Sequence, residues 1–381
     1  MSDGGEPDLS PSRARAGTPG VDDAFETTHA VSVGDARALP LPDDSVELVV
    51  TSPPYPMVEQ WDDLFRDLGE SVEGSLSAAE DGDPAAAERA FEAMHDALAP
   101  AWAEVARVLA PGGVACVTVG DATRSLGGRF RLWDNGGRVA DALESRGLDR
   151  LPGVLWHKPT NSPTKFMGSG TLPPNAYVTL EHERVLVFRN GTRRSFPAGD
   201  EARYASAFFW EERNRWFSES WEGLAGADQS LGGTAARDRS AAFPFELPYR
   251  LVNMYSTYGD RVLDPFWGTG TTTLAAMAAG RDSVGVERDP ALVPAFDERV
   301  ADLPERSRER GRRRLRDHRT FVAERDEEPG YEATHYEFPV VTKAERDLRV
   351  YAAEAVRATP LGYRVRHSPV CDPELERDSD G

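Results

Sequence analysis

Short runs of β-branched and apolar residues alternate with longer stretches of helical periodicity along most of this chain. The runs that predict buried strands are 30–33, 46–50, 114–119, 153–156, 261–264 and 283–287, and the stretches that predict helices are 91–109, 133–146, 244–258 and 271–279, with a further helix from Pro290. Strands that alternate with helices at this spacing pair in parallel, because each helix returns the chain to the same edge of the sheet. The sequence therefore predicts an α/β fold with a doubly wound, mostly parallel sheet.

The alternation divides the chain into three predicted parts. Residues 1–28 are rich in Gly, Pro, Ser and Asp without an apolar run, and they predict a disordered tail, with neither a signal peptide nor a membrane anchor. Residues 29–303 predict one catalytic domain, in which the irregular range 157–240 is expected to be a loop-rich insertion. Residues 304–381 predict a charged extension that begins with a basic helix, where eight arginines stand against three acids between 305 and 319.

The composition is strongly acidic, and its basic side is unusual. There are 64 Asp and Glu residues against 44 Lys and Arg, a formal charge of −20, and only three of the basic residues are lysines. An acidic surface keeps a protein soluble in concentrated salt, so we expect a salt-adapted, cytoplasmic protein, although a GC-rich genome would favour the same codons. The two cysteines, Cys116 and Cys371, lie far apart and predict neither a disulfide nor a metal site. Between residues 59 and 104, thirteen acids stand against two arginines, and we expect a solvated helical surface without a function.

A glycine-rich loop joins the strand at 261–264 to the helix at 271–279. In this position glycines permit a tight turn, so that a ligand can lie against the carboxyl edge of the sheet at the helix N-terminus. The loop lacks the third glycine of a dinucleotide site and the Gly-Lys-Ser/Thr of a phosphate loop. Glu287 ends the next strand, seventeen residues after Gly270, where a carboxylate can accept hydrogen bonds from ribose hydroxyls. The pattern favours an adenosine cofactor without a phosphate chain, and the alternative is a purely structural turn.

A second loop, Thr51-Ser52-Pro53-Pro54-Tyr55, follows the strand at 46–50 and is expected at the same edge of the sheet. Its two prolines restrict the backbone, so the loop offers a fixed hydroxyl, a fixed carbonyl and an aromatic face close together. These groups suit a planar heterocycle that carries an exocyclic amine. The alternative is that the prolines merely end the strand.

Together the two loops resemble those of the amino-methylating DNA methyltransferases, in the circularly permuted order that places the catalytic loop before the cofactor loop. Further landmarks of that family follow in order at 34–35, 39–43, 45–50, 107–113, 156–159, 181–188, 243–244 and 259–264. The resemblance covers residues 31 to 300 and implies the Rossmann-like fold of the S-adenosylmethionine-dependent methyltransferases. It is strongest to the cytosine-N4 enzymes, because Ser52 occupies a position where adenine-N6 enzymes typically have Asp or Asn.

The resemblance implies that S-adenosylmethionine lies over Phe266, Gly268 and Gly270. Glu287 would then bind the ribose, Asp35 would lie near the adenine amine, and Asp264 would face the methionine. The full implied set is Asp35, Asp264, Pro265, Phe266, Gly268, Gly270, Thr271, Thr272 and Glu287. Asp35 can instead be read as a turn carboxylate, and the two threonines as N-caps of the helix.

For catalysis, the resemblance implies roles for Ser52, Pro53, Pro54 and Tyr55. The Ser52 hydroxyl and the Pro53 carbonyl would accept the two hydrogens of the target amine, and Tyr55 would stack on a base flipped out of the duplex. Neither a metal nor a covalent intermediate is required. An adenine-N6 enzyme and an RNA methyltransferase remain alternatives, whereas cytosine-C5 methylation, which needs a reactive thiol, is disfavoured.

The resemblance implies double-stranded DNA as the partner, and a cognate restriction endonuclease as a second one. Because the net charge opposes binding to a polyanion, we expect a local cationic surface on the same face as Ser52, with 59–104 mostly off it. This surface includes Lys158, Lys165 and the arginines from 184 to 215. Recognition of the DNA sequence is expected in the insertion 157–240, where the residues singled out for DNA contact are Lys158, Asn161, Lys165, Arg193 and Arg194. The basic run at 306–319 is either a clamp for the DNA backbone or an exposed amphipathic helix. For the DNA sequence that the protein recognises, the resemblance suggests a short palindrome such as CTAG.

Overall fold

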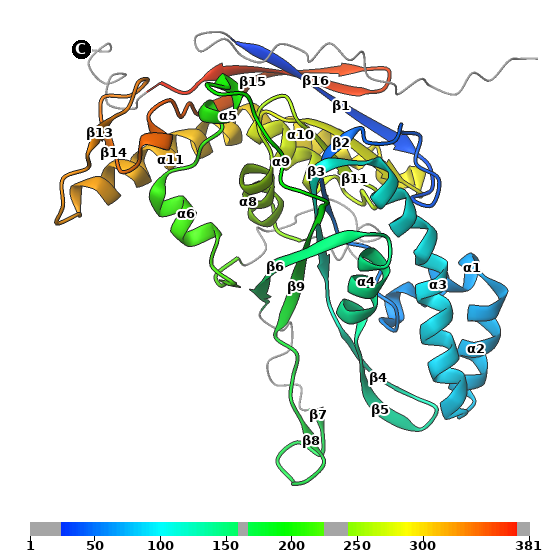
Figure 1. Cartoon of the computed structure of the whole chain (residues 1–381). Coiled ribbons are helices and arrows are strands. Elements are labelled where there is room, and N and C mark those ends of the chain that lie inside the picture. Colours follow the sequence, from blue (N-terminus) through cyan, green and yellow to red (C-terminus); the bar gives the residue numbers. More distant parts are fainter. Residues whose placement is uncertain (1–23, 159–166, 225–242, 372–381) are drawn as a thin grey trace, which may run out of the picture.

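A ten-stranded sheet forms the centre of the computed structural model, which describes residues 24–158, 167–224 and 243–371 (Figure 1). In spatial order the strands are β10 (Ser220–Trp221), β6 (Leu148–His157), β9 (His182–Asn190), β3 (Leu109–Val119), β2 (Val46–Thr51), β11 (Arg261–Asp264), β12 (Asp282–Glu287), β1 (Phe25–Val33), β16 (Gly362–Pro369) and β15 (Tyr351–Thr359). The five strands from β3 to β1 pair in parallel, and β9 and β16 run opposite to the other strands. The predicted fold class, a mostly parallel α/β sheet, is confirmed.

Helices cover both faces of the sheet, as its sequence pattern requires. One face carries α1 (Asp62–Leu68), α2 (Glu70–Glu80), α3 (Pro84–Val108) and α4 (Asn135–Glu144), and the other carries α8 (Glu246–Tyr255), α9 (Thr271–Ala279), α10 (Ala295–Val300) and α11 (Leu303–Ala323). The alternation within β2 separates the two cores: Val49 packs with the first group, and Leu48 and Val50 pack with the second. Both faces are therefore buried, which explains why the strand reads as a continuous apolar run.

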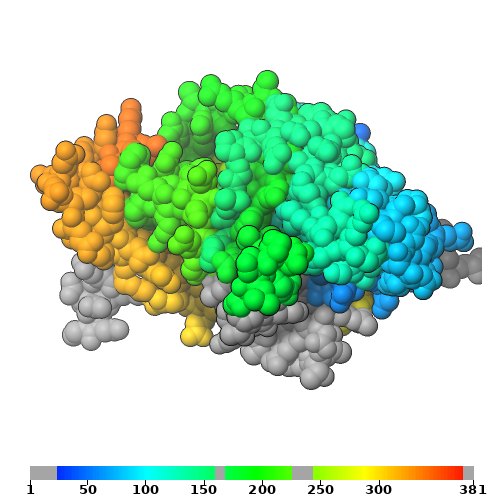
Figure 2. Space-filling view, turned by 90° about the horizontal axis from the view of Figure 1, so that it is seen from below, coloured from blue at the N-terminus to red at the C-terminus, as the bar shows by residue number. Residues whose placement is uncertain are grey.

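Smaller elements extend from this framework. They are α5 (Glu201–Ala205), α6 (Trp210–Trp216), the 3-10 turns Glu59–Trp61, Pro290–Leu292 and Lys343–Glu345, and the hairpins β4–β5 (Ala122–Leu126 and Arg129–Trp133), β7–β8 (Met167–Gly168 and Ala176–Tyr177) and β13–β14 (Tyr331–Glu332 and Pro339–Val340). Seen from below, residues of the β7–β8 hairpin stand in front, with those of α1–α3 on one side and those of α11 on the other (Figure 2). Among the described residues, no helix is long and apolar enough to cross a membrane.

The structure differs from the predicted division of the chain at three places. β9, within the range 157–240, lies between β3 and β6 and buries Val185 and Val187, so the predicted insertion contains a core strand. β15 and β16 extend the same sheet because β16 pairs with β1, so the described part of the predicted extension, residues 304–371, is joined to the catalytic domain. β1 begins at Phe25, inside the predicted tail 1–28, whose first 23 residues lie outside the described part of the chain.

The basic run predicted after residue 303 forms α11. Its apolar and small residues recur at helical spacing and are buried, among them Ser307 and Leu315. Arg314 pairs with Glu212 of α6 at 2.6 Å, and Arg310 pairs with Glu246 of α8. Of the two predicted roles, the structure therefore supports the amphipathic helix, which joins α6 and α8 to the C-terminal strands.

The order of the strands positions the site. β2 and β11 are neighbours, and the connection from β2 leads through α1–α3 to β3 on one side, whereas α9 leads from β11 to β12 on the other side. Because the connections leave in opposite directions, the carboxyl ends of β2 and β11 border a crevice at a topological switch point. The two predicted loops both begin there.

Candidate active site

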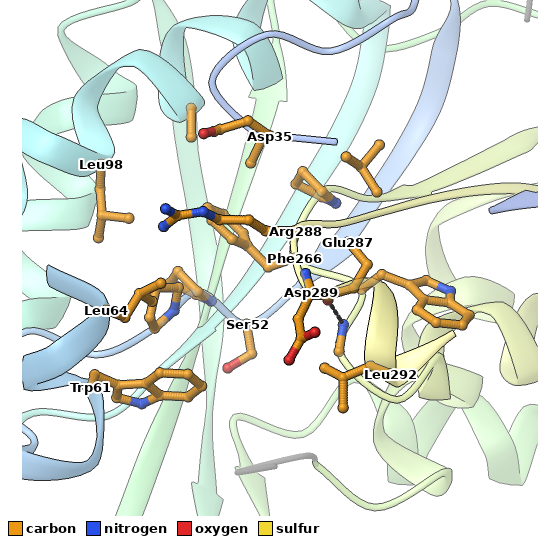
Figure 3. Close-up of a pocket in the computed structure, with 18 of the residues that line it drawn as sticks. Asp35, Ser52, Trp61, Leu64, Leu98, Phe266, Glu287, Arg288, Asp289 and Leu292 are labelled. Atoms are coloured by element: carbon orange, nitrogen blue, oxygen red, sulfur yellow. Dashed lines mark hydrogen bonds between the residues drawn. The ribbon is translucent and has the colours of Figure 1, made fainter. Parts of the chain in front are cut away.

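A cavity of about 610 Å³ opens at the carboxyl ends of β2, β11 and β12. Both predicted loops line it, and Figure 3 shows Ser52 and Phe266 facing this space together with Glu287. The volume lies within the range typical of pockets for small organic ligands. The tertiary structure thus brings together loops that are more than 200 residues apart in the sequence.

A buried hydrogen bond connects the two loops. The Thr51 hydroxyl donates to Asp264 at 2.6 Å, and the same carboxylate oxygen accepts the backbone N–H of Phe266 at 3.1 Å. Burial raises the pKa of Asp264 to about 6, and these hydrogen bonds act in the opposite direction. The positions of the catalytic and cofactor loops are therefore coupled through one carboxylate.

Behind Ser52 lies a chain of polar groups. The hydroxyl oxygens of Ser52 and Tyr55 are 2.9 Å apart, and the Tyr55 hydroxyl lies 2.9 Å from a carboxylate oxygen of Glu183. The ammonium of Lys158 donates to the other oxygen of Glu183 at 2.7 Å. Tyr55 is buried, and burial and the nearby Glu183 carboxylate hold the pKa of its phenol well above the usual range. The predicted catalytic loop is thus supported by Lys158, directly after β6, and by Glu183 of β9.

The glycine loop and Glu287 form a backbone cradle. The backbone N–H of Gly268 donates to one carboxylate oxygen of Glu287 at 2.7 Å, and that of Asp289 donates to the other at 2.8 Å. Gly268 has a φ of 55°, and a Cβ placed there would meet no atom nearer than the Phe266 carbonyl oxygen at 3.9 Å. Burial raises the pKa of Glu287. The cradle is therefore open toward the cavity and has lone pairs left to accept hydrogen bonds.

The residues that follow Gly268 have structural roles. Gly270 has a φ of 77°, and a Cβ there would meet the rings of Phe296 and Trp267 at 2.5 and 2.7 Å, so this glycine permits close packing. The Thr272 hydroxyl donates to the Val50 carbonyl at 3.2 Å, which ties α9 to β2. The Thr271 hydroxyl accepts a bond from Arg299 at 3.2 Å, although Thr271 also lines the cavity. Their expected role as N-caps is wrong, because Gly270 occupies that position without a side-chain cap.

Asp35 lines the same cavity from the loop that follows β1. Its carboxylate accepts the backbone N–H of Arg37 at 2.9 Å and further bonds from the Arg37 guanidinium at 2.8 to 3.1 Å. The side-chain bond to Arg37 lowers the pKa of Asp35. The turn-carboxylate interpretation describes these contacts, while the position of Asp35 at the cavity wall also agrees with a ligand contact.

Several lining residues come from segments to which the sequence analysis gave no function. Trp61, Leu64 and Leu98 form an apolar wall from the range 59–104, and Arg288 and Leu292 follow Glu287 (Figure 3). The expectation that 59–104 is a solvated surface without a function is therefore wrong for Trp61, Leu64 and Leu98. The spacing of Trp61 and Leu64, two apolar residues on one face of an acidic helical segment, is the sequence signal that could have indicated this apolar wall.

The comparisons with known proteins agree with this geometry. Residues 46–298 match the family model of the N6/N4 DNA methylases, whose description is "DNA methylase". The chain belongs to this family. It is 47% identical over 330 residues to the type II methyltransferase M.MthZI of Methanothermobacter thermautotrophicus, and this match covers 86% of this chain and 91% of the relative. It is also 46% identical over 280 residues to the type II methyltransferase M.MjaI of Methanocaldococcus jannaschii, covering 72% and 91%.

Solved structures give the same result for the methylase fold. TTHA0409 of Thermus thermophilus, a candidate DNA modification methylase in complex with S-adenosyl-L-methionine, is 32% identical, with a TM-score of 0.54 over 72% of this chain and 93% of that one. The cytosine-N4-specific PvuII DNA methyltransferase, at 21% identity and a TM-score of 0.50 over 72% and 88%, shows the fold alone.

The cofactor of this methylase is S-adenosylmethionine. The described residues fit it: the cradle at Gly268 opens into the cavity, and Glu287 faces the same space with a carboxylate. Aromatic and apolar walls from Phe266 and Trp61 suit an adenine ring. No group of three or more His, Cys, Asp or Glu residues in the described ranges could hold a metal ion.

The described residues that were predicted to contact DNA lie at two opposite edges of the sheet in the methylase. Lys158 follows β6 at the carboxyl edge, the same edge as Ser52, whereas Asn161 and Lys165 lie outside the described residues. Arg194 lies at the opposite edge, where it pairs with the buried Asp260 before β11 at 2.6 and 2.7 Å. Its exposed neighbour Arg193 lies on that side too. The prediction that all these arginines share the face of Ser52 is therefore wrong, because β9 carries the chain from the carboxyl edge to the amino edge.

The position of Cys116 bears on the type of methylation. This thiol is fully buried within β3, and burial raises its pKa. A buried thiol held in its neutral form cannot attack a base. The cysteine-dependent C5 mechanism is therefore not available to Cys116.

Proposed function

We propose that this methylase transfers a methyl group from S-adenosylmethionine to the exocyclic N4 of cytosine in double-stranded DNA. The observation that carries the proposal is the neutral Ser52 hydroxyl at the start of the catalytic loop, at the cavity wall and 2.9 Å from the Tyr55 hydroxyl. Serine at this position resembles the cytosine-N4 enzymes. The type II names of the relatives further support a cognate restriction endonuclease as a partner, with both proteins in the cytoplasm where the DNA lies.

The chemistry assigned to the chain is to direct a lone pair. The N4 lone pair of cytosine is delocalised into the ring, so the amine is a poor nucleophile until acceptors hold its two hydrogens. We assign these acceptors to Ser52 Oγ and the Pro53 carbonyl, while Pro54 fixes the loop and Tyr55 contacts the ring. Bound S-adenosylmethionine supplies the electrophilic methyl group. Gly268 and Glu287 hold its ribose in this proposal, and Asp264 connects that end to the catalytic loop through Thr51.

The contact with DNA is assigned to the carboxyl edge. Extrusion of the base costs a few kcal/mol, which stacking and hydrogen bonds in the cavity offset. Among the described residues of the five singled out for DNA contact, Lys158 is the cation that lies at this edge, and Asn161 and Lys165 follow it in the sequence. Arg193 and Arg194 are excluded from the proposed surface by their position at the opposite edge.

Nucleoside mass spectrometry tests the proposal. We expect DNA treated with the purified protein and S-adenosylmethionine in concentrated salt to contain N4-methylcytosine, and RNA treated in the same way to contain no new methylated nucleoside. Sequencing of the modified DNA would define the recognised site. N6-methyladenine, or modification of RNA alone, would overturn the proposed target.

A matched variant separates catalysis from cofactor binding. Ser52→Ala should lower methyl transfer by about two orders of magnitude, the effect typical of removing a preorganised hydrogen-bonding group from an active site. Its affinity for S-adenosylmethionine, measured by calorimetry, should be unchanged. A variant that lost cofactor affinity but kept its turnover at saturation would contradict the role given to Ser52.

A further inference from the structure

The polar chain behind Ser52 has a direction that can be derived from its members. The Tyr55 hydroxyl has one hydrogen to donate and, within the described ranges, three oxygens in reach: Ser52 Oγ at 2.9 Å, a Glu183 carboxylate oxygen at 2.9 Å and the Thr118 carbonyl at 3.4 Å. Carboxylate and carbonyl oxygens can only accept, whereas the Ser52 hydroxyl can do either. The direction therefore depends on which neighbour receives the Tyr55 hydrogen.

Glu183 receives it, for two reasons. A hydrogen bond to a carboxylate is about twice as strong as one between neutral groups, and Lys158 holds this carboxylate in place at 2.7 Å. The phenol also remains protonated, because burial and Glu183 keep the pKa of Tyr55 well above its usual range. The Tyr55 oxygen can then only accept from Ser52, so the Ser52 hydrogen points away from the target base.

We propose that Glu183 is a positioning residue that determines the hydrogen-bond direction of Ser52, and thereby makes the site select an exocyclic amine over a carbonyl. This inference rests on the proposed function, because it assumes that the target base presents an amine to Ser52. With its hydrogen committed to Tyr55, Ser52 Oγ faces the cavity with lone pairs only. Cytosine presents an N4 hydrogen to them, whereas uracil would present O4, a second acceptor. Two acceptors at hydrogen-bond distance repel, so uracil is rejected.

The discriminating variant is Glu183→Gln, which keeps the shape of the side chain. Lys158 attracts the amide oxygen, so the amide NH₂ group faces Tyr55 and donates to it. Tyr55 then donates to Ser52 at 2.9 Å in preference to the longer Thr118 contact, and the Ser52 hydrogen turns into the cavity. We expect kcat to fall about tenfold and the preference for cytosine over uracil to fall by about the same factor, the effect of one misdirected buried hydrogen bond.

A second substitution should reverse the first. In Glu183→Gln combined with Lys158→Met, nothing holds the amide oxygen away from Tyr55, so the amide can rotate and accept the Tyr55 hydrogen again. The double variant should recover most of the cytosine preference that Glu183→Gln loses, although it is further from the natural sequence. A general loss of structure or of charge would not produce this recovery.

The measurement is equilibrium binding of two duplexes with S-adenosylhomocysteine, the demethylated cofactor, present. The duplexes carry the recognised site with deoxycytidine or deoxyuridine at the target position. Glu181→Gln is the matched control, since this carboxylate lies two residues earlier and its side chain is 60% exposed. Tyr55→Phe, which removes the acceptor for the Ser52 hydrogen, should also weaken the preference, and Lys158→Met should not restore it. This second variant keeps the test decisive if Glu183→Gln does not fold.

Two results would overturn the inference. One is full discrimination between cytosine and uracil in Glu183→Gln with normal kcat. The other is a double variant whose preference for cytosine over uracil is no greater than that of Glu183→Gln. Mass spectrometry separates these failures from a failure of the proposed function, because it reports the methylated nucleoside of the natural protein. If that nucleoside were N6-methyladenine, the proposed function alone would be wrong, and adenine and hypoxanthine would replace the two test bases.

Discussion

Gly268 and Glu287 illustrate how two residues define one end of the cavity. The backbone of Gly268, at a φ of 55°, gives its N–H to the Glu287 carboxylate and leaves open space on its other side. We expect Gly268→Val to abolish S-adenosylmethionine binding, because a branched side chain would strain this backbone and fill that space. Glu287→Ala should weaken binding by about 1–3 kcal/mol through the loss of buried hydrogen bonds. Calorimetry measures both effects, and unchanged affinity in the two variants would place the cofactor elsewhere.

At the scale of elements, the attachment of β16 to β1 depends on buried neutral histidines. The Thr27 hydroxyl of β1 lies 2.7 Å from the ring of His29 and 2.8 Å from that of His367 in β16, and His29 also contacts Ser283 of β12 at 2.8 Å. Burial, aided by the charge of Arg281, lowers the pKa of His367 to about 3, and burial also lowers that of His29. Both rings therefore remain uncharged in the folded sheet at neutral pH.

This attachment should make folding sensitive to acid. Above the unfolded pKa of 6.5, His367 is neutral in both states and costs nothing. Below it, the unfolded chain binds a proton that the folded chain refuses, so stability is lost progressively from pH 6.5 down to about 3. His367→Gln should reduce the slope of the unfolding free energy against pH by about 1.4 kcal/mol per pH unit, measured by urea denaturation. The exposed His157→Gln is the control, and identical slopes for the His367 variant and the natural protein would refute the prediction.

For the whole molecule, the charge of −20 should make stability depend on salt. Repulsion among excess carboxylates opposes the compact state, and raising the salt from 0.1 to 1 M shortens the screening length from about 10 to about 3 Å. The ion pairs weaken as well, but 64 acids exceed 44 basic residues, so relief of repulsion should prevail. We expect the unfolding temperature to rise with KCl and to rise less with sucrose at equal osmolality, which does not screen charge. A flat or falling curve with KCl would argue against salt adaptation.

The sequence by itself determined the fold class, the two loops and the family. Alternation of β-branched runs with helical stretches is a local property, as is the tight strand-to-helix turn at Gly268, so both could be recognised without a partner segment. The same holds for Ser52-Pro53-Pro54-Tyr55, because prolines restrict the loop wherever it lies. Boundaries were less secure, since the residues around β9 are irregular and hide a strand that only its neighbours stabilise.

Only the tertiary structure decided which distant groups meet. The pairing of Tyr55 with Glu183, of Thr51 with Asp264 and of Arg194 with Asp260 joins residues 66 to 213 positions apart. No local preference encodes such contacts, because each depends on strand order and on the direction in which β9 runs. The same strand direction separates Lys158 from Arg194, although the two residues are only 36 positions apart in the sequence. The reactive groups of the loops can thus be recognised from the local sequence, whereas the residues that position those loops depend on the order and direction of the strands.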